Sequence, residues 1–287
     1  MRPIVFLSDY GLSDEFVGLC HGVIARIAPG AHVIDLTHGI PPEDVVRGAV
    51  VLAGSVGFVP DDSVFLAVVD PGVGTSRRAV AVETAAGAYL VGPDNGLLWL
   101  ACVALGGALS AAEVHSPAPS RAPASPSALP SFSAPPFASP TFHGRDVFAP
   151  AAAHLAAGGP MSDLGPPVDP ASLVALTVPE PAVGDRSLSA VVLGIDRFGN
   201  VQLAAKPDDL AWAGLDPAAR VEIWIGDRRV EATRASTFGD VGAGDLALIV
   251  DSAGWLALVQ NQGSAAQHLS VSLGDSVLIT GPSEYQP

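Results

Sequence analysis

Basic residues are scarce in this 287-residue chain, which carries 14 Lys and Arg residues against 29 Asp and Glu residues. Lys206 is its single lysine. Binding to the phosphates of nucleic acids needs clustered basic side chains. The scattered basic residues and the formal net charge of −15 therefore argue against a nucleic-acid partner. The same acidic balance favours cationic ligands.

Cysteine is also rare, and long hydrophobic runs are missing. Cys20 and Cys102 lie in apolar stretches and form neither a CxxC pair nor a metal-ligand spacing, so we predict two buried free thiols. No apolar run reaches the roughly 18 residues of a membrane span. The first residues enter a short strand without the apolar region of a secretory signal, which predicts a cytoplasmic protein with no membrane partner.

Three common catalytic signatures are absent from the chain. It contains no HExxH, no Gly-x-x-x-x-Gly-Lys and no Gly-x-Ser-x-Gly pattern. Metalloprotease, P-loop and α/β-hydrolase functions consequently have no support from the sequence.

The first part of the chain alternates short apolar runs with helical patterns. Strands separated by helices of this length imply right-handed crossovers and a parallel sheet, as in a Rossmann-like α/β/α domain. Expected strands are 4–7, 32–35, 64–69, 80–83 and 88–91, and expected helices are 14–27, 42–56, 97–105 and 147–157, the last with Asp146 as its N-cap. We assign residues 1–178 to this domain.

The pattern changes after about residue 177, where short strands follow one another with turn signals and no helix between them. This pattern predicts a smaller all-β barrel or sandwich domain over residues 188–287. A Pro-rich linker, 179–181, precedes it. The expected strands are 189–195, 221–225, 229–232, 246–250, 255–259 and 276–279.

A stretch of almost pure Ser, Pro and Ala interrupts the first domain at about residues 117–139. This composition supports neither a strand nor a helix, so we interpret it as a surface insertion. Its place shortly before His143 leaves a lid as the less favoured alternative.

Two segments carry the clearest chemistry. The apolar run 64–69 predicts a buried strand, and Asp70-Pro-Gly breaks it, so Asp70 stands at the carboxyl end of that strand, where open α/β sheets bind ligands. Arg77 follows after two glycines, and alternation along an extended segment directs Arg78 to the opposite face. Because arginine keeps its proton, Asp70 and His143 are the candidates for proton handling.

These segments also resemble a known family, the S-adenosyl-L-methionine (SAM) hydroxide adenosyltransferases, which are relatives of the SAM-dependent fluorinases and chlorinases. Each motif is weak by itself, but their joint presence in family order is specific. The resemblance rests on Ser-Asp-Tyr-Gly at 8–11, Asp-Pro-Gly-Val-Gly at 70–74, Gly-Pro-Asp-Asn-Gly at 92–96, Phe-His-Gly-Arg-Asp at 142–146, Ile-Asp-Arg-Phe-Gly-Asn at 195–200 and Asn-Gln-Gly-Ser-Ala-Ala at 261–266.

The resemblance implies hydrolysis of SAM to adenosine and L-methionine, with Asp70, Arg77 and His143 as the catalytic triad. It implies that Asp9 binds the ribose, and that Asp196 and Asn200 bind the methionine ammonium group and the adenine. The other substrate-binding positions it implies are Phe238, Ser252, Gln260 and Gln262. An ordinary core role for Phe238 is about as well supported. The reaction requires no metal or cofactor, and the family suggests a homotrimer with sites between subunits.

Departures from the family pattern separate the alternatives. Halide-using relatives replace the Asp and His of the triad, whereas Asp70 and His143 are intact here, which favours water over chloride or fluoride. Ala253 stands where those relatives carry an Arg toward the methionine carboxylate, and Glu43 stands where they use an aromatic. A SAM-dependent halogenase and a non-catalytic SAM or adenosine binder remain the alternative functions.

Overall fold

The structure is a computed structural model that describes residues 1–115, 139–216 and 219–282. The chain divides into two compact units, unit 1 (Met1–Leu176) and unit 2 (Thr177–Pro287). Most of the Ser-Pro-Ala stretch lies outside the described residues. None of the helices in the described ranges combines the length and apolar character needed to span a bilayer.

Unit 1 is built on a seven-stranded sheet in the order β2-β1-β3-β5-β4-β6-β7. The first four strands of that order pair in parallel, while β4 and β6 run antiparallel to their neighbours. The strands are β1 (Ile4–Ser8), β2 (Val33–Thr37), β3 (Val64–Val68), β4 (Ala79–Thr84), β5 (Tyr89–Pro93), β6 (Ala108–Glu113) and β7 (Pro167–Val168).

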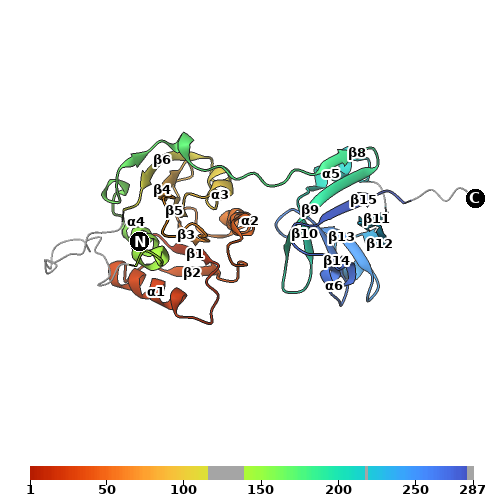
Figure 1. Ribbon diagram of the computed structural model, residues 1–287, viewed down its shortest axis with the longest axis horizontal. Coiled ribbons are helices and arrows are strands. Elements are labelled where there is room, and N and C mark those ends of the chain that lie inside the picture. Colours follow the sequence, from red (N-terminus) through yellow and green to blue (C-terminus); the bar gives the residue numbers. More distant parts are fainter. Residues whose placement is uncertain (116–138, 217–218, 283–287) are drawn as a thin grey trace, which may run out of the picture. The chain divides into compact units, whose positions relative to one another are not determined.

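Helices cover both faces of this sheet (Figure 1). Apolar side chains of α1 and α4 pack on one face in a core with Phe6 and Leu66, and those of α2 and α3 pack on the other with Leu7 and Phe65. Successive side chains along β1 and β3 thus point to opposite faces of the sheet and pack in different cores, as strand pleating requires. The helices are α1 (Phe16–Ile27), α2 (Val45–Ser55), α3 (Trp99–Ala104) and α4 (Ala149–Ala156), with the short turns η1 (Val56–Phe58), η3 (Met161–Asp163) and η4 (Pro170–Ser172).

Unit 2 is a barrel. Its sheet has the order β10-β14-β13-β12-β11-β15-β9-β8, and an added β10–β9 pairing closes seven strands on themselves around an apolar core. Closure removes the open edges of a sheet. The strands are β8 (Ala182–Gly184), β9 (Ser187–Ile195), β10 (Val201–Leu203), β11 (Arg220–Ile225), β12 (Arg228–Arg234), β13 (Leu246–Val250), β14 (Leu256–Gln260) and β15 (Ser276–Thr280).

The Rossmann-like and barrel architectures are confirmed, with three corrections in detail. Unit 2 contains two short helices, α5 (Pro207–Trp212) and α6 (Ala265–Leu269), where the sequence predicted none. The sheet of unit 1 ends in antiparallel strands. Asp146 is no N-cap, because a π-helical turn, η2 (Gly144–Phe148), precedes α4 and the amide of Asp146 already donates to the carbonyl of Phe142.

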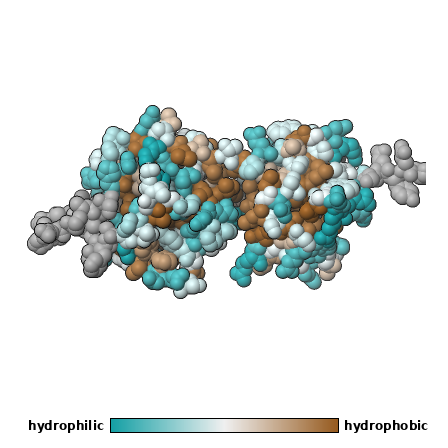
Figure 2. Space-filling view, viewed as in Figure 1, coloured by the Kyte–Doolittle hydropathy of each residue, from teal (hydrophilic) through white to brown (hydrophobic). Residues whose placement is uncertain are grey.

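Large apolar side chains reach the surface of both units. On the viewed face, Figure 2 shows hydrophobic residues beside hydrophilic ones in each unit. Among the most exposed are Leu12 (79%) and Phe58 (83%) in unit 1 and Trp212 (74%) and Phe198 (68%) in unit 2. Contacts that cover such side chains would be favourable.

Candidate active site

A nearly buried ion pair lies just beyond the carboxyl end of β3. Arg77 Nε donates to Asp70 Oδ1 at 2.8 Å, and Arg77 Nη2 donates to Asp70 Oδ2, so the pair is bidentate. Their side chains are only 10% and 6% exposed. A fork of two parallel hydrogen bonds fixes the carboxylate in one orientation. Each oxygen still has lone-pair capacity for a further donor.

His143 joins this pair through the same guanidinium. Arg77 Nη2 lies 2.9 Å from His143 Nδ1. Because arginine can only donate, Nδ1 must be the acceptor, and the ring carries its hydrogen on Nε2. Burial, and then the positive charge of Arg77, lower the pKa of His143 below its usual 6.5. His143 is therefore held neutral, and its Nε2–H can donate to a further partner.

The segment that carries His143 depends on glycine. His143 directly precedes η2, and the next residue, Gly144, sits against the ring of Tyr10, whose hydroxyl a Cβ atom at this position would strike. Asp146 stabilises the same turn, because its carboxylate accepts hydrogen bonds from the Ser139 amide (2.6 Å) and the Arg145 side chain. Phe-His-Gly-Arg-Asp is thus a positioning motif as well as a source of His143.

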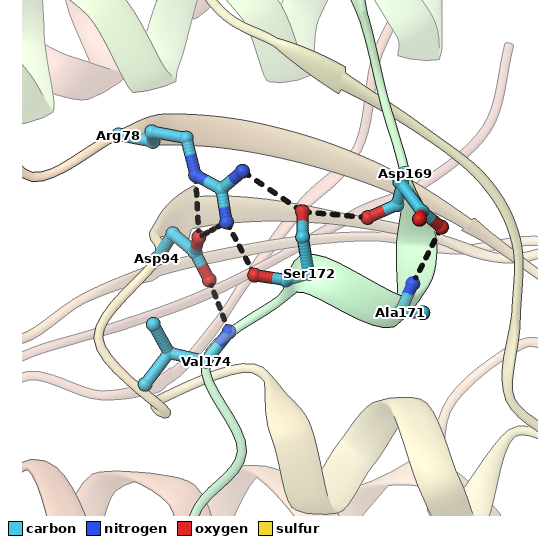
Figure 3. Close-up of polar contacts among 6 residues, drawn as sticks. All are labelled: Arg78, Asp94, Asp169, Ala171, Ser172 and Val174. Carbon is cyan, nitrogen blue, oxygen red and sulfur yellow. Dashed lines mark hydrogen bonds and ion pairs between the residues drawn. The ribbon is translucent and has the colours of Figure 1, made fainter.

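Arg78 has a different task from Arg77. Its Nε donates to Asp94 Oδ2 at 2.9 Å, and its Nη1 donates to Ser172 Oγ at 3.0 Å. Asp94 Oδ1 also accepts the amide of Val174 at 2.8 Å. Figure 3 shows these bonds tying the segment around η4 to the end of β5. The two adjacent arginines point to separate partners, as the alternation along the chain predicted, and Arg78 is structural.

Asp9 follows β1 and lies close enough to Asp70 for their charges to interact. Burial raises the pKa of Asp9, and the negative charges of Asp70 and Glu43 act in the same direction. Asp9 Oδ2 accepts the amide of Glu43 at 3.0 Å. The donor is the backbone amide of Glu43, a residue whose φ is positive at 66°. The carboxylate is thereby held in place beside the triad.

Asp196 and Asn200 form one turn between β9 and β10 in unit 2. Asp196 Oδ1 accepts the amides of Phe198 (2.8 Å) and Asn200 (2.9 Å), and Asp196 Oδ2 accepts Asn200 Nδ2 at 2.7 Å. Gly199 completes the turn with φ 81°, against Ser264, where a side chain would collide. Asp196 therefore shapes the turn that presents Asn200.

The remaining predicted positions fall at two ends of β14. The pairing of Val201 with Leu258, and the bond from the Ala266 amide to the Gly199 carbonyl, put the Asn200 turn at the end where Gln260 and Gln262 lie. Ser252 lies in the β13–β14 turn at the other end. Five strand residues separate these ends by about 14 Å. Phe238, in η5 (Phe238–Asp240), is 44% exposed and is not a core aromatic.

In the fold, two histidines that are distant in the sequence, His21 and His38, contact the same aspartate, Asp35. His21 Nε2 and His38 Nε2 lie 2.8 and 3.1 Å from the same oxygen of Asp35. An aspartate at the end of a strand is commonly an ordinary turn residue, so Asp35 alone carries no functional signal in the sequence. The sequence does not reveal this cluster, because His21 belongs to α1 and comes close to Asp35 and His38 only when β1 pairs with β2.

Two family models match the chain, one for each unit. The model described as the SAM hydroxide adenosyltransferase N-terminal domain matches residues 4–165. The corresponding C-terminal domain model matches residues 190–278. The two matches lie in the two compact units described above.

Named relatives align over almost the full chain. An (R)-S-adenosyl-L-methionine hydrolase of Salinispora tropica is 48% identical, with 96% of this chain and 97% of the relative covered. One from Thermus thermophilus is 42% identical over 96% and 98%. A fluorinase of Actinopolyspora mzabensis is 32% identical over 97% of both. A solved structure of an uncharacterized conserved protein from Thermotoga maritima has a TM-score of 0.83 at 36% identity, covering 96% of this chain and 99% of that one.

Proposed function

Since the chain belongs to the SAM hydroxide adenosyltransferase family, we propose that it hydrolyses SAM to adenosine and L-methionine. The observation that carries the proposal is the intact Asp70–Arg77–His143 constellation. It offers a fixed carboxylate and a fixed N–H donor, which are the groups needed to orient a water molecule.

The reaction is an in-line displacement at C5′ of the ribose. The water oxygen forms a bond to C5′ while the bond from C5′ to the sulfonium sulfur breaks, and the electron pair of that bond stays on sulfur. Methionine leaves as a neutral thioether, so its departure needs no general acid. The only proton to be removed is the one from the attacking water.

We assign that proton to Asp70. His143 cannot take it through Nδ1, which already accepts from Arg77. Its Nε2–H instead donates to the water and orients a lone pair toward C5′. Arg77 fixes the orientation of the Asp70 carboxylate and keeps His143 in the required tautomer. The Asp70 proton then passes to solvent.

Asp9 and the residues of unit 2 serve substrate binding in this proposal. The two oxygens of Asp9 suit the vicinal ribose hydroxyls. In unit 2, Asn200, Gln260 and Gln262 suit the adenine, while Ser252 suits the methionine end. Asp196 supplies the negative charge for the ammonium group, and Phe238 an exposed ring for stacking on adenine.

We also propose a cytoplasmic homotrimer in which unit 1 of one subunit and unit 2 of the next share each substrate. The exposed apolar side chains on both units are available for such an interface. Without Asp70 and His143 in place, a halogenase would be the stronger alternative, because halide needs no proton removed.

A direct assay tests the function. Purified protein is incubated with SAM, as separate epimers at sulfur, in halide-free buffer with EDTA, and products are identified by chromatography. We expect equal amounts of adenosine and methionine, including turnover of the R epimer that the relatives' names specify. Activity lost with EDTA and restored by a divalent ion would contradict the metal-free chemistry. If the protein binds SAM but forms neither adenosine nor methionine, the proposed hydrolysis is wrong and the protein is a SAM-binding protein.

A further inference from the structure

A second constellation on unit 1 is made of residues that have no part in the proposed reaction. One nitrogen from each of His21 and His38 and one carboxylate oxygen of Asp35 lie within 4.8 Å of one another. We propose that these three residues bind one divalent transition metal ion of the Zn²⁺ type per chain. This inference does not depend on the proposed function.

The donor set fits such an ion. Two imidazoles and a carboxylate are the three protein ligands of many zinc sites, and the same set binds other first-row metals. Zinc at about 2.0–2.1 Å from each ligand requires ligand atoms about 3.4 Å apart. Asp35 Oδ1 lies 2.8 and 3.1 Å from the two nitrogens, so binding an ion requires these atoms to move apart by about 0.6 and 0.3 Å. Hard cations such as Mg²⁺ prefer all-oxygen sites.

The site is held in advance by the fold. The ring of Phe6, which is fully buried, packs edge-on against His38 at 4.6 Å and tilted against His21 at 6.1 Å. Phe6 is also the residue paired with Asp35 across the parallel strands β1 and β2, and the register shifts immediately after this pair. Such irregularities re-aim side chains beside functional sites. The cluster is therefore positioned by three elements: α1 carries His21, β1 carries Phe6 and β2 carries Asp35.

His38 has the outer contact that metal-binding histidines need. Its Nδ1 lies 2.8 Å from Ser8 Oγ, and its side chain is 3% exposed. A serine hydroxyl can donate or accept. Without metal, it donates to Nδ1 while Nε2–H donates to Asp35. With metal, Nε2 binds the ion and Nδ1–H donates to Ser8.

A coordination position stays open to solvent, because the His21 and Asp35 side chains are 35% and 45% exposed. The ion can therefore enter and keep a water ligand. Its effect on the molecule would be to fix the turn before α1. The backbone of His38 already accepts the Gly11 amide at 2.7 Å, and Ser8 accepts the Tyr10 amide. None of the three ligands belongs to the Asp70–Arg77–His143 constellation, so turnover in EDTA remains expected.

Equilibrium dialysis of the metal-stripped protein against Zn²⁺ tests the proposal, with Co²⁺ absorption as a report on coordination. We expect one ion per chain, and at least a tenfold loss of affinity in His21→Ala and in Asp35→Asn. The control is His32→Ala, an exposed histidine just before β2, which should bind as the unaltered chain does. Circular dichroism confirms folding of each variant.

Thermal melting supplies a second readout. Zn²⁺ should raise the Tm of the unaltered chain and of His32→Ala, but not that of Asp35→Asn. If His21→Ala and Asp35→Asn bind zinc as tightly as the unaltered chain, the ion is held elsewhere and the site is wrong. If the unaltered chain does not bind Zn²⁺ stoichiometrically, the proposal is wrong and the three residues form only a hydrogen-bond network.

Discussion

Replacing Asp70 with asparagine should lower kcat for SAM hydrolysis by about a hundredfold or more, the scale of a lost general base. Asparagine has nearly the same shape and keeps one of the two bonds from Arg77, but it cannot take the proton of the attacking water. The affinity for SAM should fall only modestly. Steady-state kinetics and calorimetry on the same preparation separate the two effects.

His143→Ala should cause a loss of similar size, because it removes the Nε2–H donor that orients the water. His143→Gln tests the role more sharply. A glutamine carries an oxygen that can accept from Arg77 and an N–H that can donate, so it should recover part of the lost kcat. A glutamine variant no better than alanine would contradict the donor role assigned to His143.

Matched controls separate chemistry from general damage. Asp62→Asn changes an exposed acid near the start of β3, and His32→Ala changes an exposed histidine. Both should retain the kcat of the unaltered chain. Because Asp70 and Arg77 are nearly buried, thermal melting of each variant is needed to exclude loss of folded protein as the cause.

Asp9→Asn and Asp196→Asn should instead weaken SAM binding, by about tenfold or more, while kcat at saturation changes little. Hydrogen bonds to charged groups contribute on the order of 1.5–3 kcal/mol. Asparagine is chosen because it can still accept the amide of Glu43 at residue 9 and the amides of Phe198 and Asn200 at residue 196. The backbone bonds of both turns are kept, and the charge and one acceptor oxygen are lost. At residue 196 that oxygen is the one that accepts Asn200 Nδ2.

Isothermal calorimetry measures this effect, with Asp227→Asn, an exposed acid of unit 2, as the control. The logic requires the two pairs of residues to behave differently. If variants of Asp70, His143, Asp9 and Asp196 all lose affinity alike at unchanged kcat, Asp70 and His143 are ligand contacts and the water-activating role is wrong.

The sequence predicted the architecture because its apolar runs and turn signals match the elements closely. Asp70 lies just beyond the carboxyl end of β3, and the alternation of Arg77 and Arg78 corresponds to their separate ion pairs. The expected strands do not include β6, and neither its place in the sheet nor the antiparallel direction of β4 was predictable, since strand pairing depends on contacts distant in sequence. Helices of six and five residues, such as α5 and α6, span less than two turns and leave little periodicity to detect.

Two features of the polar side chains are visible only in the folded structure and not in the spacing of residues along the sequence. The neutral tautomer of His143 follows from one contact with Arg77, and no pattern in the sequence encodes it. The His21–Asp35–His38 cluster likewise depends on the parallel pairing of β1 and β2. Both findings concern polar side chains whose chemistry is decided by a neighbour far along the chain.

The origin of the 5′ oxygen tests the central claim most directly. SAM is turned over in oxygen-18 water, with and without added chloride, and the nucleoside product is examined by mass spectrometry. Water attack at C5′ predicts adenosine that carries the label on its 5′ oxygen, at a rate that chloride does not change. Unlabelled adenosine, or a 5′-chloro nucleoside formed at a comparable rate, would contradict it.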